Sequence, residues 1–190
     1  ALSVGLPITP RGAGTSCAGN AVGPGLVIDV RRHLNRIHHI DPEAQTAVVD
    51  PGVVQATLTA AAQEYGLRFG PDPSTVTRCT IGGMIGNNAC GPRALGYGRT
   101  ADNVVDVDLV TGTGAHITAS TPPADLSAGL EELVGANLEL IRTEFGTFGR
   151  QVSGYSLEHL LPENGRSLPR FLAGTEGTLG VTTRATVRLV

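Results

Sequence analysis

The sequence predicts an α+β protein in which strands and helices are mixed along the chain. Segments rich in β-branched residues favour strands at 26–30, 46–50 and 103–111, and apolar residues at helical spacing favour helices at 53–65 and 130–145. These segments do not alternate with the strict strand and helix period of a doubly wound sheet, so the α+β class is preferred. At 190 residues the chain can form one domain, or two small subdomains that share a ligand.

The first elements are short and lie between turns. Residues 1–7 are typical of the last turn of a helix that ends at Gly5, and Ile8 and Thr9 follow as a short strand. The strand candidates at 26–30 and 46–50 are separated by charged residues that we expect to form turns.

The next elements surround a second glycine-rich segment. The alanine-rich helix at 53–65 follows Pro51 and Gly52 and is expected to end at Gly66. The prolines at 71 and 73 favour extended backbone, and residues 81–88 can form a short helix whose glycines permit close packing.

The C-terminal half is predicted from the same signals. It comprises a strand at 103–111 with a hairpin turn to 115–118, a linker at 121–129, a helix at 130–145, and strands at 171–173 and 181–190.

The most informative segment is the glycine-spaced loop at residues 10–20. Glycine has no Cβ, so its backbone N–H groups can approach an anion closely, and Thr15 and Ser16 add hydroxyl donors. Arg11 is the one cationic residue of the loop, so neutralisation would depend mainly on amide dipoles, as suits a diphosphate in a cleft. The loop therefore predicts a nucleotide cofactor.

Two common phosphate-binding motifs do not fit this loop. A Walker loop requires a lysine where Asn20 stands, and all 14 basic residues of the chain are arginine. A Rossmann loop opens a helix, whereas Gly19, Gly23, Pro24 and Gly25 follow here and prevent one. The amides must be presented from irregular backbone, which indicates another cofactor architecture.

Composition excludes several classes of protein. A net charge of −3, with only 4 phenylalanines, 3 tyrosines and no tryptophan, argues against nucleic-acid binding. No stretch reaches the roughly 18 apolar residues of a membrane span, and no signal peptide is evident. Cys17, Cys79 and Cys90 form no C-x-x-C pair, so no metal site is expected, and reduced thiols favour a cytoplasmic protein.

Other side chains that could carry chemistry are interpreted as structural. Cys90 is expected to be a small buried packing residue rather than a reactive thiol, and His33, His38 and His39 to be solvated. Metal ligation is not favoured at His116 or His159, and Glu131 and Glu132 are expected at a helix start. For Arg93 and Arg99 two roles are left open, anion binding and surface ion pairing.

Four ordered motifs together resemble a known family. They are the segments 10–16, 71–74 with 81–91, 97–98, and 174–181. In this order they resemble the PCMH-type FAD-binding domain of the vanillyl-alcohol oxidase and p-cresol methylhydroxylase superfamily. The run at 86–100 is most similar to the bacterial FAD-linked D-lactate and D-2-hydroxyglutarate dehydrogenases.

The resemblance implies two α+β subdomains with FAD extended between them, and it assigns roles to matching positions. The pyrophosphate loop would comprise Pro10, Arg11, Gly12, Ala13, Gly14, Thr15 and Ser16. The diphosphate, ribityl and ring region would be lined by Pro71, Asp72, Pro73, Ser74, Thr77, Gly82, Gly83, Gly86 and Asn87. The other side of the cofactor would meet Glu176, Gly177, Gly180 and Val181.

Two departures from the family pattern carry consequences. Ala13 stands where the family commonly has glycine, so its φ angle must be negative. The loop has no histidine, which is the usual covalent anchor of flavin in this superfamily, so we predict non-covalent FAD.

The resemblance also implies how this chain relates to a whole enzyme. Residues 1–190 would be the FAD-binding domain, with one subdomain at about 1–70, truncated at its start, and a second at about 71–190. The substrate cap domain would be absent, an iron-sulfur domain could follow downstream, and the catalytic residues are unknown. The implied reaction is oxidation of a D-2-hydroxy acid with hydride transfer to flavin N5, which the isolated chain would not carry out. A non-catalytic nucleotide or anion-binding module and a structural scaffold are the alternatives.

Overall fold

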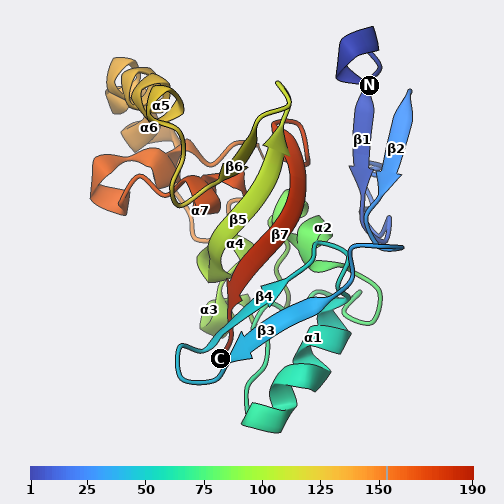
Figure 1. The fold of residues 1–190 in the computed structure, drawn as a ribbon. Helices are drawn as coiled ribbons and strands as arrows, with labels where there is room; N and C mark the ends of the chain where they lie inside the picture. Colours follow the sequence, from blue (N-terminus) through green and yellow to red (C-terminus); the bar gives the residue numbers. More distant parts are fainter. Residues whose placement is uncertain (153) are drawn as a thin grey trace.

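The computed structural model describes residues 1–152 and 154–190 as two sheets with helices packed around the larger one (Figure 1). The small sheet consists of the parallel strands β1 (Ile8–Arg11) and β2 (Leu26–Asp29). The larger sheet has five strands in the order β3-β4-β7-β5-β6. This combination confirms the α+β class.

The five-stranded sheet is antiparallel throughout, with the last strand at its centre. Its strands are β3 (Ile37–Asp41), β4 (Thr46–Val49), β5 (Val104–Thr111), β6 (His116–Thr118) and β7 (Gly180–Arg188). β7 pairs with β4 on one side and β5 on the other, so it joins the two hairpins β3–β4 and β5–β6. Figure 1 shows β5 and β7 running side by side through the middle of the molecule.

The helices are short. The α-helices are α1 (Gln55–Ala62), α2 (Ile81–Asn87), α3 (Ala94–Tyr97), α4 (Thr100–Asn103), α5 (Ala124–Ala136), α6 (Leu138–Glu144) and α7 (Leu168–Leu172). The 3-10 helices are η1 (Leu2–Val4), η2 (Gln63–Tyr65), η3 (Leu157–Leu160) and η4 (Pro162–Asn164). No helix of the described residues is both long enough and apolar enough to cross a membrane.

The core lies between the five-stranded sheet and the helices that pack on it. Phe69, Leu58 and Ile81 are fully buried, as are Val49 of β4 and Val187 of β7. Burying an apolar side chain of this size contributes roughly 1.5–3 kcal/mol. α2 and α7 pack against β7 and β5, so this core fixes the elements that carry the second and third glycine-rich segments.

Several elements match their predictions closely. α1 and η2 together fill the helix predicted at 53–65, and the left-handed Gly66 ends it. The short helix at 81–88 and the strand at 103–111 appear as α2 and β5, and the predicted hairpin joins β5 to β6.

The region at 121–145 is more helical than predicted. α5 begins at Ala124, directly after Pro122 and Pro123, so a linker over 121–129 is wrong. Proline is tolerated just before a helix, because the first N–H groups of a helix have no partner within it. Glu131 and Glu132 consequently lie in the middle of α5 rather than at its start.

Two further segments differ from the predictions. Residues 171–173 are the end of α7, whose N-cap Ser167 accepts a hydrogen bond from the Arg170 N–H, and not a strand. The segment 37–41 is the strand β3 instead of a charged turn. His38 on this strand lies 2.6 Å from the Asp50 carboxylate, so it is not simply solvated.

The change from one sheet to the other falls between β2 and β3. β4 pairs with β7, so residues 37–49 belong to the five-stranded sheet. The division into two subdomains around a cofactor, with its boundary near residue 70, stays a prediction.

Candidate functional site

The loop that follows β1 presents unused backbone donors. In the described part of the chain, the N–H groups of residues 12–16 donate to no protein acceptor. Gly14 has a φ of +66°, in the left-handed region that favours glycine. Ala13 is not among the residues with positive φ, as its methyl group requires. The loop therefore has the free amides expected of an anion cradle.

The first glycine-rich segment packs directly on the second. A Cβ on Gly12 would collide with the Thr80 hydroxyl and would lie 3.6 Å from the Gly83 Cα. Thr80 is the N-cap of α2 and accepts a hydrogen bond from the Gly83 N–H at 3.2 Å. The absence of a side chain at position 12 thus allows the loop to reach α2.

The third segment is joined to both of the others. The Glu176 N–H donates to the Gly86 carbonyl at 2.9 Å, and the Asn87 amide donates to the Glu176 carboxylate at 2.8 Å. A Cβ on Gly177 would collide with the ring of Pro10. Three segments far apart in sequence therefore meet at one place, as their glycine content predicted.

These segments line a cavity of about 540 Å³. Predicted site residues on its wall are Pro10, Arg11, Gly12, Ala13, Gly14, Thr15, Ser16, Pro73, Ser74, Gly82, Gly83, Gly86, Asn87, Glu176, Gly177, Gly180 and Val181. Ligand pockets commonly have volumes of roughly 300–1,000 Å³. The cavity is thus large enough to hold a substantial part of a dinucleotide.

Three predicted site residues do not line this cavity. Pro71 is buried, and its carbonyl accepts a hydrogen bond from Gln55. The Asp72 carboxylate instead faces Arg93, with 3.4 Å between Oδ2 and Nε. Thr77 is exposed in the turn before α2. Arg93 is accordingly a surface ion-pair partner, one of the two interpretations that the sequence left open.

The sequence did not identify several wall residues, including Thr80, Asn88, Cys90, Arg150 and Thr182. Asn88 and Cys90 belong to the motif at 81–91, but no site role was assigned to them. Arg150 lies on a loop with no motif of its own, and only the tertiary structure brings it to the cavity.

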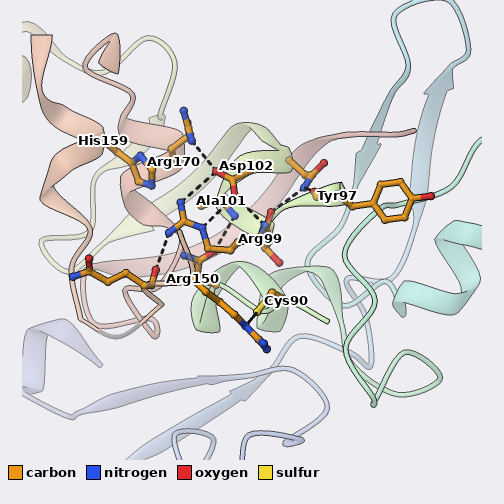
Figure 2. Close-up of polar contacts among 12 residues, drawn as sticks. Cys90, Tyr97, Arg99, Ala101, Asp102, Arg150, His159 and Arg170 are labelled. Atoms are coloured by element: carbon orange, nitrogen blue, oxygen red, sulfur yellow. Dashed lines mark hydrogen bonds and ion pairs between the residues drawn. The ribbon is translucent and has the colours of Figure 1, made fainter. Parts of the chain in front are cut away.

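A cluster around Asp102 holds that loop in place (Figure 2). Asp102 accepts hydrogen bonds from the Arg99 N–H at 2.9 Å and from Arg170 Nη2 at 2.8 Å. Arg99 Nη1 donates to the Gln151 carbonyl at 2.7 Å. Burial alone would raise the pKa of Asp102, but the hydrogen bonds and charge of Arg99 outweigh it, and the pKa lies below its ordinary value. Arg99 is thus an internal anchor, which excludes a surface ion pair.

His159 lies beside this cluster and is buried, with 4% of its surface exposed. Burial and the nearby charges of Arg170 and Arg99 lower the pKa of His159 to about 4. Its ring is therefore neutral near pH 7. No group of three or more possible metal-ligating side chains occurs among the described residues.

Arg150 and Cys90 meet on the cavity wall. Arg150 Nε donates to Cys90 Sγ at 3.1 Å, a contact drawn in Figure 2. Cys90 is half-buried and lines the cavity, so its interpretation as a buried packing residue is wrong. The chain turns after α2, and this turn brings the thiol to the cavity.

Comparison with known families identifies the domain. Residues 1–120 match the family model described as "FAD binding domain". The chain belongs to the FAD binding domain family. FAD is therefore the cofactor of this domain, and the resemblance in the motifs is confirmed.

Relatives of this FAD binding domain include enzymes named for small hydroxy acids. It is 36% identical to a D-2-hydroxyglutarate dehydrogenase of Pseudomonas putida, covering 97% of this chain and 20% of that protein. It is 36% identical to the glycolate oxidase subunit GlcD of Bacillus subtilis and 32% identical to a D-lactate dehydrogenase of Archaeoglobus fulgidus, covering 97% of this chain in each case and 32% and 33% of those proteins. The chain thus spans a fifth to a third of the length of these curated relatives.

Solved structures agree on the fold. An alkyldihydroxyacetonephosphate synthase aligns with all of this FAD binding domain and 30% of its own chain, with a TM-score of 0.66 and 22% sequence identity. At this identity the likeness concerns the fold alone.

Proposed function

We propose that this chain binds FAD non-covalently and forms the cofactor-binding part of a flavin-dependent dehydrogenase that oxidises a D-2-hydroxy acid. The observation that carries the proposal is the convergence of three glycine-rich segments on one cavity, one of which has free backbone N–H groups. The D-2-hydroxyglutarate, D-lactate and glycolate enzymes among the relatives supply the substrate class.

The residues of the cavity fit a dinucleotide. The free N–H groups of residues 12–16 and the hydroxyls of Thr15 and Ser16 can donate to the diphosphate. The Arg11 guanidinium lies at this loop, with its Nη2 3.0 Å from the point that a Cβ on Gly14 would occupy. The described wall includes no histidine, which favours non-covalent binding.

When bound, FAD supplies a hydride acceptor at its N5 atom. The role of this chain is to hold and orient the cofactor and to line one side of the space in which substrate and flavin react. Glu176, the one carboxylate among the described wall residues, is engaged by the Asn87 amide. We therefore propose that the base that takes the hydroxyl proton is supplied from outside this wall, as by a cap domain. A following iron-sulfur domain and a cytoplasmic location are part of the same proposal.

Anaerobic reduction of the flavin tests the function. The full-length protein is reconstituted with FAD and mixed with D- and L-lactate, D- and L-2-hydroxyglutarate, and glycolate. Bleaching of the flavin absorption by a D-2-hydroxy acid or glycolate, and much more slowly by the L-isomers, is the expected result. A flavin that none of these acids reduces would refute the substrate class.

Acid precipitation tests the mode of attachment, which spectra alone do not reveal. Non-covalent FAD is expected in the supernatant after precipitation and centrifugation. Flavin that stays with the pellet would show a covalent bond. A protein that takes up no FAD on titration would contradict the whole proposal.

A further inference from the structure

Two arginines line the cavity, and their surroundings differ from those of the paired arginines. In the part of the chain that the structure describes, neither Arg11 nor Arg150 forms an ion pair, whereas Arg93, Arg99, Arg142, Arg166 and Arg170 do. Seven further arginines form no ion pair among the described residues either, but none of them lies on the cavity wall: Arg31, Arg32, Arg36, Arg68, Arg78, Arg184 and Arg188. A cation that faces a cavity without a protein carboxylate is suited to a ligand anion.

In the proposed arrangement, Arg11 lies beside the diphosphate of the cofactor. It lies against Gly14 in the loop that would hold the diphosphate. That loop contacts the start of α2 through Gly12, whereas Cys90, the partner of Arg150, follows the other end of this helix. α2 has 7 residues, which at 1.5 Å per residue separates its ends by roughly 10 Å. The two cations thus serve different parts of the cavity.

The Arg150 side chain is oriented and has unused donors. Its Nε–H is directed at Cys90 Sγ at 3.1 Å. An arginine side chain carries five N–H donors, and the four on the terminal nitrogens of Arg150 have no acceptor among the described residues. Two parallel N–H groups of a guanidinium match the two oxygens of a carboxylate.

The backbone beside Arg150 is also held firmly. Arg99, which is tied to Asp102, donates to the carbonyl of Gln151, the next residue (Figure 2). The carbonyl of the next residue and the Nε of Arg150 therefore each have a partner, whereas the terminal nitrogens of this exposed arginine are open to a ligand. Such an arrangement limits the conformational entropy that binding would cost.

We propose that Arg150 binds the carboxylate of the substrate within this cavity, with Cys90 as the positioning residue for its guanidinium. This inference rests on the proposed function, in which the diphosphate is held by the loop at residues 12–16 and the substrate is a 2-hydroxy acid. The inference assigns a substrate-binding residue to the FAD-binding domain itself.

The test uses full-length protein reconstituted with FAD and titrated with oxalate, a dicarboxylate that has no C–H bond to oxidise. Binding is followed by the change in the flavin spectrum, and the KM for the best D-2-hydroxy acid is measured in parallel. Arg150→Gln is expected to weaken oxalate binding and to raise KM by about 10- to 100-fold, as for the loss of a charged hydrogen-bonded pair, with FAD affinity changed less than about threefold. Arg150→Lys should retain part of the binding, and Cys90→Ala should weaken it by about threefold.

Arg188→Gln is the matched control, because Arg188 is exposed on β7 and does not line the cavity. This variant should bind oxalate and FAD as the wild type does. Unchanged oxalate affinity and KM in Arg150→Gln would overturn the inference. An equal loss of FAD affinity would overturn it too, because Arg150 would then serve the cofactor. If no D-2-hydroxy acid reduces the flavin but oxalate binding still requires Arg150, the proposed function fails and the carboxylate-binding role stands.

Discussion

Individual residues of the first loop combine an unusual backbone with a functional surface. Gly14 and Gly66 both have positive φ, at +66° and +72°. Gly14 lies on the cavity wall, where its neighbours in the loop present their amides, whereas Gly66 at the end of η2 and its neighbours do not line the cavity. The two glycines therefore separate the cost of backbone strain from the cost of losing an anion cradle.

Gly14→Val is expected to weaken FAD binding at least about tenfold, because a branched side chain in the left-handed region shifts the loop and its amides. Gly66→Val imposes a similar strain of ~1–2 kcal/mol away from the wall. Flavin fluorescence quenching measures the dissociation constant of FAD, and urea unfolding measures stability. Equal losses of FAD affinity in both variants would show that strain, and not the cradle, is responsible.

His159 predicts a dependence of stability on pH. Its folded pKa of about 4 lies below the ordinary 6.5, so the unfolded state takes up a proton first as the pH falls. The stability that this group contributes is complete above pH 6.5 and is lost progressively toward pH 4, up to roughly 3 kcal/mol.

Urea unfolding at pH 7 and pH 5 checks this expectation, since most carboxylates stay ionised in that range. The wild type should be less stable at pH 5, and His159→Leu should lose most of this pH dependence. His116→Leu is the control, because His116 is exposed on β6. A pH dependence that survives in His159→Leu would assign it to another group.

At the scale of elements, the Arg99, Asp102 and Arg170 cluster joins α4, α7 and the loop at Gln151. Asp102 is the shared acceptor, and it is partly buried. The exposed pair of Arg142 and Glu163 has the same chemistry on the surface, with 2.7 Å between Nε and Oε1. The two pairs thus differ mainly in burial and in what they connect.

Asp102→Ala is expected to destabilise the fold by roughly 1–3 kcal/mol, because Arg99 and Arg170 lose the partly buried carboxylate that they share. It should also weaken carboxylate binding by releasing the loop that carries Arg150. Glu163→Ala should change neither stability nor binding measurably, since exposed pairs contribute little. Urea unfolding and oxalate titration provide the two readouts. A stable Asp102→Ala variant would show that the cluster does not hold the loop.

At the scale of the whole molecule, FAD would connect parts of the chain that belong to different sheets. The loop at 12–16 follows β1 of the small sheet, whereas residues 174–177 lead into β7 of the larger one. A ligand that binds only the folded state stabilises it, by ~2.7 kcal/mol at a free concentration of 100 times Kd.

Hydrogen exchange with and without FAD tests this view of the molecule. The amides of residues 12–16 should exchange more slowly once FAD is bound, because they then have acceptors. The hairpin turn at 112–114 lies outside the cavity wall and should exchange at the same rate in both states. Unchanged exchange at 12–16 would refute the assigned role of the loop.

The sequence by itself determined the class of fold, the short helix α2, the strand β5 and the three glycine-rich segments, because these depend on local backbone preferences. It also determined the cofactor, since the loop at 10–20 excluded the Walker and Rossmann architectures and four ordered motifs matched a family. Periodicity failed at β3, which is a strand because it pairs with the neighbouring β4, and at α7, which packs against the distant β5 and α4.

Only the tertiary structure decided which side chains share the cavity. Asp72 and Arg150 are two examples. Asp72 was predicted on the wall but pairs with Arg93 away from it, whereas Arg150 lies on the wall although its loop carries no motif. The hydrogen bond from Arg99 to the Gln151 carbonyl holds that loop, across 52 residues of sequence. Local preference encodes the shape of each segment, whereas contacts between distant residues determine where a charged side chain comes to lie.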